Sequence, residues 1–289
     1  MKDISIQIEE CSTCPRKCNA DRSLRKGLCK APWEPVVASV MAHRGEEQII
    51  SGSRGSGTVF FAGCNLGCVF CQNYDISQQC YGNTFSSDEL SELFMCLERD
   101  GVHNINLVTP GHFVIPIAAA IKQAKAKGIK IPFVYNSNGY DSIESLQLMD
   151  GQIDIYMPDF KYSNNTNGLL YSGVPDYFTV ASKALREMYR QVGEPIIKNG
   201  IMHRGVLIRH LVMPGLSEDS FAVLSWIKAN LPNVRINLMD QYRPEYKASE
   251  FDEINRRLTH SEFHIVNEHF NQLGLRSDDD KGVNNNDKR

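Results

Sequence analysis

The sequence predicts an α/β protein whose core is an open barrel of six strand–helix units. Beyond about residue 58, short apolar runs alternate with segments whose apolar residues keep helical spacing. This alternation is typical of parallel strands joined by crossover helices. Six units are two fewer than a closed eight-fold barrel needs, so we expect a partial (β/α)6 barrel. A cysteine-rich segment precedes the repeat, and we expect it to form an N-terminal extension.

The expected strands are short and mostly apolar, and cover residues 58–62, 104–108, 131–135, 153–157, 206–212 and 234–239. Several helices between them have recognisable ends. Ser86 and Glu89 form a capping box before the first one. A second helix opens near Pro116 and closes at Gly128. Further helices are expected at about 143–149, 177–192 and 218–231.

Composition divides the chain into four segments. Residues 1–57 form a Cys-rich, metal-binding extension that ends in a Gly/Ser-rich loop leading into the first strand. Residues 58–245 form the barrel, and residues 246–275 form closing helices. Residues 276–289 are charged and polar with almost nothing to bury, so we expect a disordered tail.

The overall charge and hydropathy exclude several classes of protein. The chain of 289 residues carries 31 basic and 34 acidic residues, a formal charge of −3. No bulk basic field therefore favours nucleic acid or an anionic membrane as the main partner. The longest apolar run, residues 113–121, is too short to span a bilayer and contains Pro116. The N-terminus has no hydrophobic signal core, so we expect a cytoplasmic protein.

Three cysteines follow the first expected strand within one short loop: Cys64, Cys68 and Cys71. A cubane cluster has four irons and normally takes four thiolates, so three thiolates would leave one iron open. Gly63 and Gly67 suit a loop that must bend tightly around such a cluster. A zinc site with a fourth ligand from elsewhere is an alternative, as are three unrelated buried cysteines.

The spacing Cys64-x3-Cys68-x-Phe70-Cys71 resembles the signature of the radical S-adenosylmethionine (SAM) enzymes. The resemblance implies a 4Fe–4S cluster whose open iron binds SAM. It further implies reductive cleavage of SAM to a 5'-deoxyadenosyl radical, with no catalytic side chain beyond the cluster and SAM. The chemistry belongs to the cofactors, and the protein supplies position and exclusion of water.

Within this superfamily, residues 50–245 resemble the pyruvate formate-lyase activating enzyme branch, and most closely its relatives with an extra N-terminal cysteine segment. The stretch from Asn136 to Gly139 is similar to an Asp-Thr-Asn-Gly stretch near the SAM ribose, with Asn136 in place of the Asp. Residues 109–111 stand where the family has a Gly-Gly-Glu-type stretch whose carbonyls meet the SAM amine. The resemblance implies cofactor contacts from Phe70, Thr109, Pro110, Gly111, Asn136, Ser137, Asn138, Asp159 and Arg209.

Charged and titratable residues in these stretches also have structural interpretations. Asp159 and Lys161 either line the cofactor pocket or pair with each other at a strand end. Arg209 meets a SAM carboxylate or an acidic side chain of the protein. His112 and His210 are interpreted as hydrogen-bonded core histidines rather than proton shuttles.

A second group of cysteines lies in the N-terminal extension: Cys11, Cys14, Cys18 and Cys29. Four thiolates are a complete ligand set for a zinc ion or a fully ligated iron–sulfur cluster. Binding would fold a segment that has little else to bury. Zinc, a second cluster and four ordinary thiols all remain possible on spacing alone.

The resemblance implies an enzyme, a radical SAM oxidoreductase that activates or modifies a protein or peptide. Installation of a glycyl radical is the most specific version. An electron donor such as flavodoxin or ferredoxin is the implied partner. The alternatives are radical modification of a small molecule and a non-catalytic, Cys-rich metal-binding or redox-sensing protein.

Overall fold

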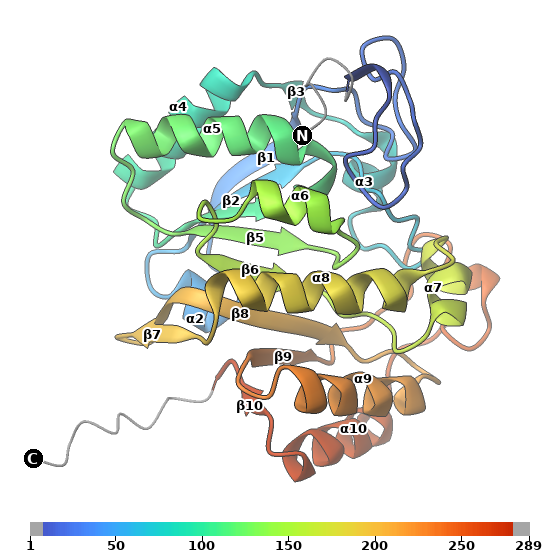
Figure 1. Ribbon diagram of the computed structural model, residues 1–289. Coiled ribbons are helices and arrows are strands. Elements are labelled where there is room, and N and C mark those ends of the chain that lie inside the picture. The colour runs from blue at the N-terminus through green and yellow to red at the C-terminus, as the bar shows by residue number, and fades with distance from the viewer. Residues whose placement is uncertain (1–7, 280–289) are drawn as a thin grey trace, which may run out of the picture.

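The computed structural model describes residues 8–279 and contains one mixed sheet. All six expected strands are present: β2 (Ser56–Phe61), β4 (Ile105–Val108), β5 (Phe133–Ser137), β6 (Ile155–Pro158), β8 (Ile201–Leu211) and β9 (Arg235–Met239). They lie in this order across the sheet, each parallel to the next (Figure 1). The α/β fold with a sheet of parallel strands is therefore confirmed.

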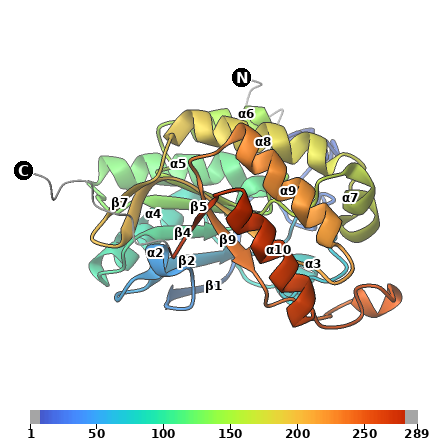
Figure 2. The same cartoon turned by 90° about the horizontal axis from the view of Figure 1, so that it is seen from below.

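The crossover helices cover one face of this sheet. They are α4 (Ser87–Arg99), α5 (Val114–Ala126), α6 (Ile143–Leu148), α8 (Tyr177–Val192) and α9 (Ser217–Asn230). In Figure 2, α5, α6, α8 and α9 lie along the same side of the strands. The expected capping box opens α4, because the Ser86 hydroxyl accepts from the Glu89 amide and the Glu89 carboxylate accepts from the Ser86 amide.

Other helices lie outside this layer of crossovers. The short α3 (Tyr74–Gln79) follows the cysteine loop, and α7 (Asn165–Ser172) follows β6. The closing helix α10 (His260–Gln272) packs on α9 and begins with a second capping box, between Thr259 and Glu262.

Several elements were not predicted. Strand β1 (Val36–His43) pairs antiparallel with β2 and also with the two-residue β3 (Asn83–Thr84). Helix α2 (Gln48–Ser51) connects β1 to β2, and β7 (Ile196–Lys198) forms a hairpin with β8. The N-terminal 57 residues are thus more than an extension and a loop, because β1 belongs to the main sheet.

Part of the segment expected to be a disordered tail is ordered. Arg276 and Ser277 form β10, which adds to β9 as a parallel strand. This short pairing orders the start of the segment expected to be disordered. The rest of that prediction, residues 280–289, lies outside the described residues, as do residues 1–7.

Strand register separates the two faces of the sheet. Val134, Ile155 and Leu207 point away from the crossover helices and pack with Ile49 and Ile50 of α2. Because side chains alternate between faces along a strand, Asn106, Asn136 and Arg209 share this second face, which we call the inner face. The main core lies on the opposite face, between the strands and the crossover helices.

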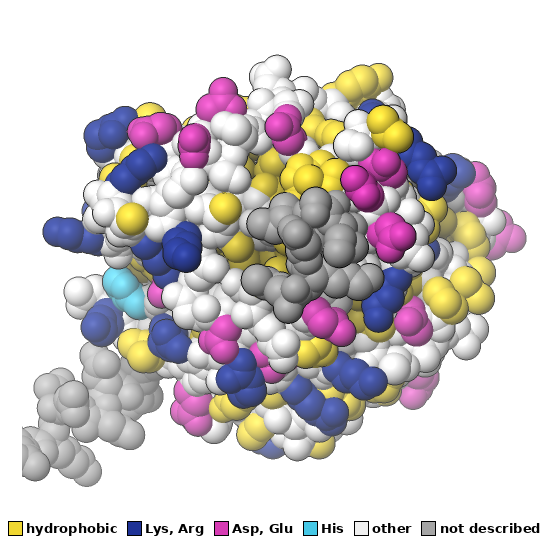
Figure 3. All heavy atoms as spheres, turned by 45° about the horizontal axis from the view of Figure 1, so that its top comes forward, with side chains coloured by type: hydrophobic (Ala, Val, Ile, Leu, Met, Phe, Trp, Pro, Cys, Tyr) yellow, Lys and Arg dark blue, Asp and Glu magenta, His cyan; other side chains and the backbone are white. Residues whose placement is uncertain are grey.

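No helix within residues 8–279 is long and apolar enough to cross a membrane. On the face shown in Figure 3, Lys and Arg side chains are interspersed with Asp and Glu. That face carries no extended field of a single charge.

Candidate functional site

The cysteine loop lies at the carboxyl end of β2 and is held there by backbone hydrogen bonds. The Cys64 amide donates to the Cys29 carbonyl over 3.1 Å. The Gly67 amide donates to the Ser172 carbonyl over 3.0 Å, and the Val69 amide to the Tyr171 carbonyl over 2.9 Å. The loop is therefore fixed between the N-terminal segment and α7.

Gly63 is required at the start of this loop for two reasons. Its φ of +81° is a conformation that side-chain-bearing residues rarely adopt. A Cβ at this position would also lie 2.6 Å from the Cys29 carbonyl oxygen. Only glycine lets the two cysteine segments approach so closely.

The three thiols of the loop are close enough to influence one another electrostatically, and two of them, Cys64 and Cys68, are desolvated. Burial raises the pKa of Cys64 to about 12, and the neighbouring Cys68 and Cys71 add to the effect. Burial also raises the pKa of Cys68, although Lys161 opposes the shift. Thiols in this setting ionise readily only when a cation replaces the proton, as a bound metal does.

Polar side chains surround the three sulfurs. Asn138 Nδ2 donates to Cys64 Sγ over 3.3 Å. Ser172 Oγ lies 3.0 Å from Cys68 Sγ, and Ser77 Oγ lies 3.3 Å from Cys71 Sγ. Hydrogen bonds of this kind tune an iron–sulfur cluster through its thiolates.

The donor set fits a cluster by its chemistry. Within residues 8–279, no three His, Cys, Asp or Glu side chains are placed closely enough to hold a single metal ion in their present rotamers. The fit depends instead on three thiols in one short loop whose thiolate forms would repel one another, each with a hydrogen-bond partner.

The predicted cofactor-contact stretches converge at the carboxyl ends of the strands next to this loop. Asn138 also donates to Asn65 Oδ1 over 2.7 Å, which ties the end of β5 to the loop. Ser137 Oγ accepts from the Gly139 amide over 3.1 Å. The Asn136 carbonyl accepts the Thr109 amide hydrogen over 2.8 Å, which joins the ends of β4 and β5.

Thr109 adopts a strained backbone conformation. Its φ is +59°, unusual for any L-residue and more so for a β-branched one. Pro110 follows, and a Cβ on Gly111 would lie 2.5 Å from Asp141 Oδ1, so any larger residue there would displace this buried carboxyl group. Strain of this kind is concentrated at functional sites, where the surrounding fold sustains it.

Asp159 bridges two cations on the inner face. Its Oδ2 lies 2.7 Å from Lys161 Nζ, and its Oδ1 lies 3.0 Å from Arg209 Nε. Burial opposes ionisation of Asp159, but the two cations outweigh it and hold the pKa of this carboxyl below its usual value. Arg209 Nη2 also donates to Asn136 Oδ1 over 2.8 Å. The charges predicted at these positions are therefore paired with one another.

Phe70 and the two histidines are buried. The Phe70 ring packs on Tyr242, with ring centroids 5.9 Å apart. His112 Nε2 lies 2.9 Å from the Ala62 carbonyl oxygen, and burial lowers the pKa of this histidine to about 3. His210 has a partner at each ring nitrogen, the Phe160 carbonyl and the Ser220 hydroxyl. Both histidines match their interpretation as core residues.

The N-terminal cysteines gather beside the loop. Cys11, Cys14 and Cys29 are buried, and burial raises the pKa of Cys14 to about 12 with contributions from the other three thiols. A Cβ on Gly27 would lie 3.4 Å from Cys18 Sγ and 3.5 Å from Cys29 Sγ. Glycine thus leaves the space next to two of the four sulfurs, as a metal site requires.

Arg22 is the cation nearest this second group. Its guanidinium donates to the carbonyls of His112 and Pro32 and lies 3.8 Å from Cys11 Sγ. It opposes the effect of burial on the pKa of Cys29. A buried Arg beside four thiols favours their ionised, metal-binding form.

Four polar residues of the inner face were missed by the sequence analysis. Glu46 and Glu47 lie just before α2, Asn106 lies on β4 and Asn237 on β9. Asn237 Nδ2 donates to Glu47 Oε1 over 2.9 Å, a contact between residues 190 positions apart. The only signal in the sequence was the adjacent pair of glutamates.

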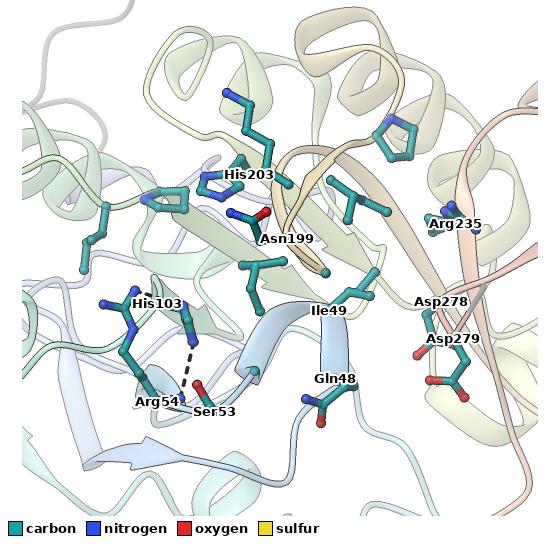
Figure 4. Close-up of a pocket in the computed structure, with 18 of the residues that line it drawn as sticks. Gln48, Ile49, Ser53, Arg54, His103, Asn199, His203, Arg235, Asp278 and Asp279 are labelled. Carbon is teal, nitrogen blue, oxygen red and sulfur yellow. Dashed lines mark hydrogen bonds between the residues drawn. The ribbon is translucent and has the colours of Figure 1, made fainter. Parts of the chain in front are cut away.

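A separate cavity of about 1230 Å³ lies at the amino ends of the strands (Figure 4). Its lining includes Arg54, His103, His203, Arg235 and Asp278. In Figure 4 the Arg54 and His103 side chains face each other, and their nearest nitrogens are 3.0 Å apart. None of the predicted site residues lines this cavity, so it is distinct from the cysteine end of the barrel.

The partial barrel, with three clustered thiols at the carboxyl end of its first parallel strand, defines a class of cluster-binding α/β enzymes. Residues 58–225 match the Radical SAM superfamily, and the chain belongs to this superfamily. Membership implies a 4Fe–4S cluster and SAM as cofactors.

The chain is also similar to individual proteins. The uncharacterized protein MJ0674 of Methanocaldococcus jannaschii is 34% identical over 273 residues, which cover 90% of this chain and 75% of that protein. Streptococcus suis SuiB superposes with a TM-score of 0.50 at 10% identity. That match covers 75% of this chain but only 46% of SuiB, so it shows the fold alone. TsrM from Kitasatospora setae, a radical SAM methyltransferase, gives a TM-score of 0.48 over 68% of this chain and 37% of its own.

Proposed function

We propose that the protein is a radical SAM oxidoreductase of the activating-enzyme type that activates or modifies a protein or peptide. Installation of a glycyl radical is the most specific form of this proposal. The observation that carries it is the trio Cys64, Cys68 and Cys71 in one partly buried loop at the carboxyl end of β2. The matches identify the superfamily and not a branch within it, so the resemblance to activating enzymes supports the finer assignment.

The cofactors supply the radical chemistry, since a reduced 4Fe–4S cluster can cleave bound SAM to a 5'-deoxyadenosyl radical. The protein's own residues hold and shield these groups. The three thiolates would ligate three irons, with Asn138, Ser172 and Ser77 as hydrogen-bond partners of the sulfurs.

Three stretches could bind SAM next to the cluster. Backbone carbonyls at residues 109–111 would accept from its amine, and the polar side chains of Asn136 and Ser137 suit ribose hydroxyls. Asp159 and Arg209 would face the same ligand as a neutralised pair.

Surface features near the loop support a macromolecular substrate and an electron-carrier partner. Leu169 and Leu170 of α7 and Leu24 of the N-terminal segment are exposed apolar side chains. Exposed basic residues lie in the same N-terminal segment, namely Lys17, Arg25, Lys26 and Lys30. Such a mixed surface suits an acidic flavodoxin or ferredoxin as electron donor.

Anaerobically reconstituted protein tests the enzymatic part. After reduction and addition of SAM, it should release 5'-deoxyadenosine, and Cys71→Ala should abolish the release. Cys96→Ala is the matched control, because Cys96 is an exposed cysteine on α4 outside both groups. Equal release by the wild type and Cys71→Ala would favour the alternative, a non-catalytic metal-binding or redox-sensing protein.

The activase version needs a partner protein. Pull-down under argon should recover it, and electron paramagnetic resonance should then detect a carbon-centred radical that is lost when the partner's target Gly becomes Ala. Turnover of a small molecule without any protein radical would favour the alternative of small-molecule modification.

We infer that Cys11, Cys14, Cys18 and Cys29 hold a second group, either a zinc ion or an iron–sulfur cluster. The burial of Cys11, Cys14 and Cys29, the gap left by Gly27 and the nearby Arg22 support this inference. Metal analysis of wild type and Cys14→Ser distinguishes the two groups. Loss of one zinc per chain identifies zinc, and loss of iron beyond that bound by the loop identifies a cluster.

A further inference from the structure

The inner face of the sheet carries buried polar atoms that have no partner. Asn106 is fully buried on β4, and neither its amide nitrogen nor its amide oxygen has a hydrogen-bond partner. Its register partner Val134 belongs to the inner cluster with Ile49 and Ile50, so the Asn106 side chain faces the barrel interior. An unpaired buried amide is rare in folded proteins and calls for a specific explanation.

The turn between β1 and α2 places two carboxylates toward the same interior. Glu47 Oε1 accepts from Asn237, but Glu47 Oε2 is buried and unpaired. Glu46 Oε1 lies 3.7 Å from His43 Nδ1, a nitrogen that makes no hydrogen bond. Four of the eight buried, unpartnered side-chain atoms in the described chain therefore belong to three inner-face residues, His43, Glu47 and Asn106.

Three carboxyl groups face two permanently charged cations on this face, and Glu46 also lies beside His43. Glu46, Glu47 and Asp159 face Arg209 and Lys161, and both cations are already engaged by Asp159. Burial raises the pKa of Glu46, and its neighbour Glu47 raises it further, while Arg209 opposes the shift. A water molecule could satisfy the unpaired atoms, whereas a bound cation would both satisfy the acceptors and pair with the carboxyl groups that Arg209 and Lys161 do not engage.

We propose that the inner face binds a nitrogen cation of the substrate, an ammonium or guanidinium group, through Glu46 and Glu47, with Asn106 beside it. This inference rests on the proposed function and names the substrate class of that site. Ammonium and guanidinium groups donate three to five hydrogen bonds and accept none. Glu47 Oε2, Glu46 and Asn106 Oδ1 offer the acceptors such a group needs. The substrate is then a peptide or small molecule that carries a Lys-like or Arg-like group.

Binding can be measured without turnover on the full chain with its cluster reconstituted. The probe is N-acetylarginine methylamide, and its neutral counterpart is N-acetylcitrulline methylamide. Calorimetric titration should show the arginine probe binding about tenfold or more tightly than the citrulline probe, because a charge-assisted hydrogen bond is lost. N-acetyllysine methylamide should bind in the same way.

The matched variants are Glu47→Gln and Glu144→Gln. Glu47→Gln keeps the shape and the acceptor for Asn237, and should weaken binding of the arginine probe by about tenfold or more. Glu144→Gln, an exposed position on α6, should bind like the wild type. Equal binding of both probes, no binding of either cationic probe, or an unaffected Glu47→Gln would each overturn the proposal.

A second variant separates ligand binding from folding. Asn106→Leu removes two unpaired polar atoms and should raise the melting temperature of the protein without probe. The same variant should weaken binding of the arginine probe. A higher melting temperature with unchanged binding would overturn the role of Asn106, and a lower melting temperature would mean that the amide is satisfied within the fold.

Failure of this inference is distinguishable from failure of the proposed function. Release of 5'-deoxyadenosine without preference for cationic probes would leave the enzyme assignment intact and overturn the cation site. Preference for cationic probes without cleavage of SAM would support the cation site and overturn the enzyme assignment.

Discussion

Arg209 and Asp159 join the carboxyl ends of β8 and β6, with both Nε and Nη2 of the arginine within 3.0 Å of Asp159 Oδ1. The pair is only 19% and 15% exposed at its side chains. Together with Lys161 and Asn136 it forms the polar centre of the inner face next to the cysteine loop. The ladder between the two strands covers only Ile155 and Tyr156 of β6, and the Asp159–Arg209 pair, with the backbone bridge between the same residues, links them again where SAM would bind.

Asp159→Asn should destabilise the protein by about 3 kcal/mol, because it leaves the charge of Arg209 buried without its counter-ion. Chemical denaturation of the full chain measures this change. The double variant Asp159→Asn/Arg209→Met should lose less than the sum of the two single variants. Asp150→Asn is the control, because its partner Arg190 is 57% exposed, and the free energy of unfolding should stay nearly unchanged. Strict additivity in the double variant would contradict the coupling.

Gly63→Ala should destabilise the protein by about 3 kcal/mol, from left-handed strain plus a clash with the Cys29 carbonyl. Gly101→Ala is the matched control, with a φ of +82° and nothing within 4 Å of the added Cβ, and should cost about 1 kcal/mol. Urea unfolding measures both. The iron content after reconstitution should fall in Gly63→Ala and stay unchanged in Gly101→Ala. If both variants lost the same amount of stability, the contact of Gly63 with the Cys29 carbonyl would be unimportant.

Thr109 should prefer glycine to alanine. Since φ at Thr109 is +59°, Thr109→Gly should be more stable than Thr109→Ala by about 1 kcal/mol. At the exposed strand residue Thr84, the alanine variant should be more stable than the glycine variant. Glycine there only increases the conformational freedom of the unfolded chain. Thermal denaturation of the four variants checks the comparison. The same order at both positions would mean that Thr109 is not strained.

His210 should make stability depend on pH. Burial lowers the pKa of His210, whose neutral ring donates from Nδ1 to Phe160 and accepts at Nε2 from Ser220. Its contribution is therefore complete above the unfolded pKa of about 6.5 and is lost as the pH falls below it, by about 1.4 kcal/mol per pH unit. Unfolding measured between pH 7 and 5 should show a shallower slope for His210→Gln than for the wild type. Parallel slopes would contradict a neutral, buried His210.

The barrel strands were predictable because each is a compact apolar run at a regular interval from the next. The boundaries shifted where backbone chemistry overrides hydropathy, as at residues 131–137, where Pro132 lacks an amide hydrogen and β5 begins at Phe133. Strand β1 was missed because its sequence, VVASVMAH, has small residues and no clear alternation. This segment is a strand because it pairs with β2, and such pairing depends on the folded structure rather than on the local sequence.

The site residues also fall into those that the sequence could reveal and those that it could not. The cysteine trio was visible because its ligands lie within one loop. The contact between Glu47 and Asn237 was not, because it joins residues from opposite ends of the chain. Likewise, composition alone could not show that Arg209 pairs with Asp159, since that depends on the register of β6 and β8.

The pairing of β1 with β2 bears on how this chain can be shortened. The family match starts at residue 58, inside β2, yet β1 pairs with β2 from Val37 to His43. Arg16 supplies the donor for the Asn65 carbonyl within the cysteine loop. A truncation to the matched region would expose a bare strand edge and leave that carbonyl without its donor. The matched region therefore lacks contacts that complete its sheet and its cysteine loop, and a shortened version of this protein should keep both Arg16 and β1.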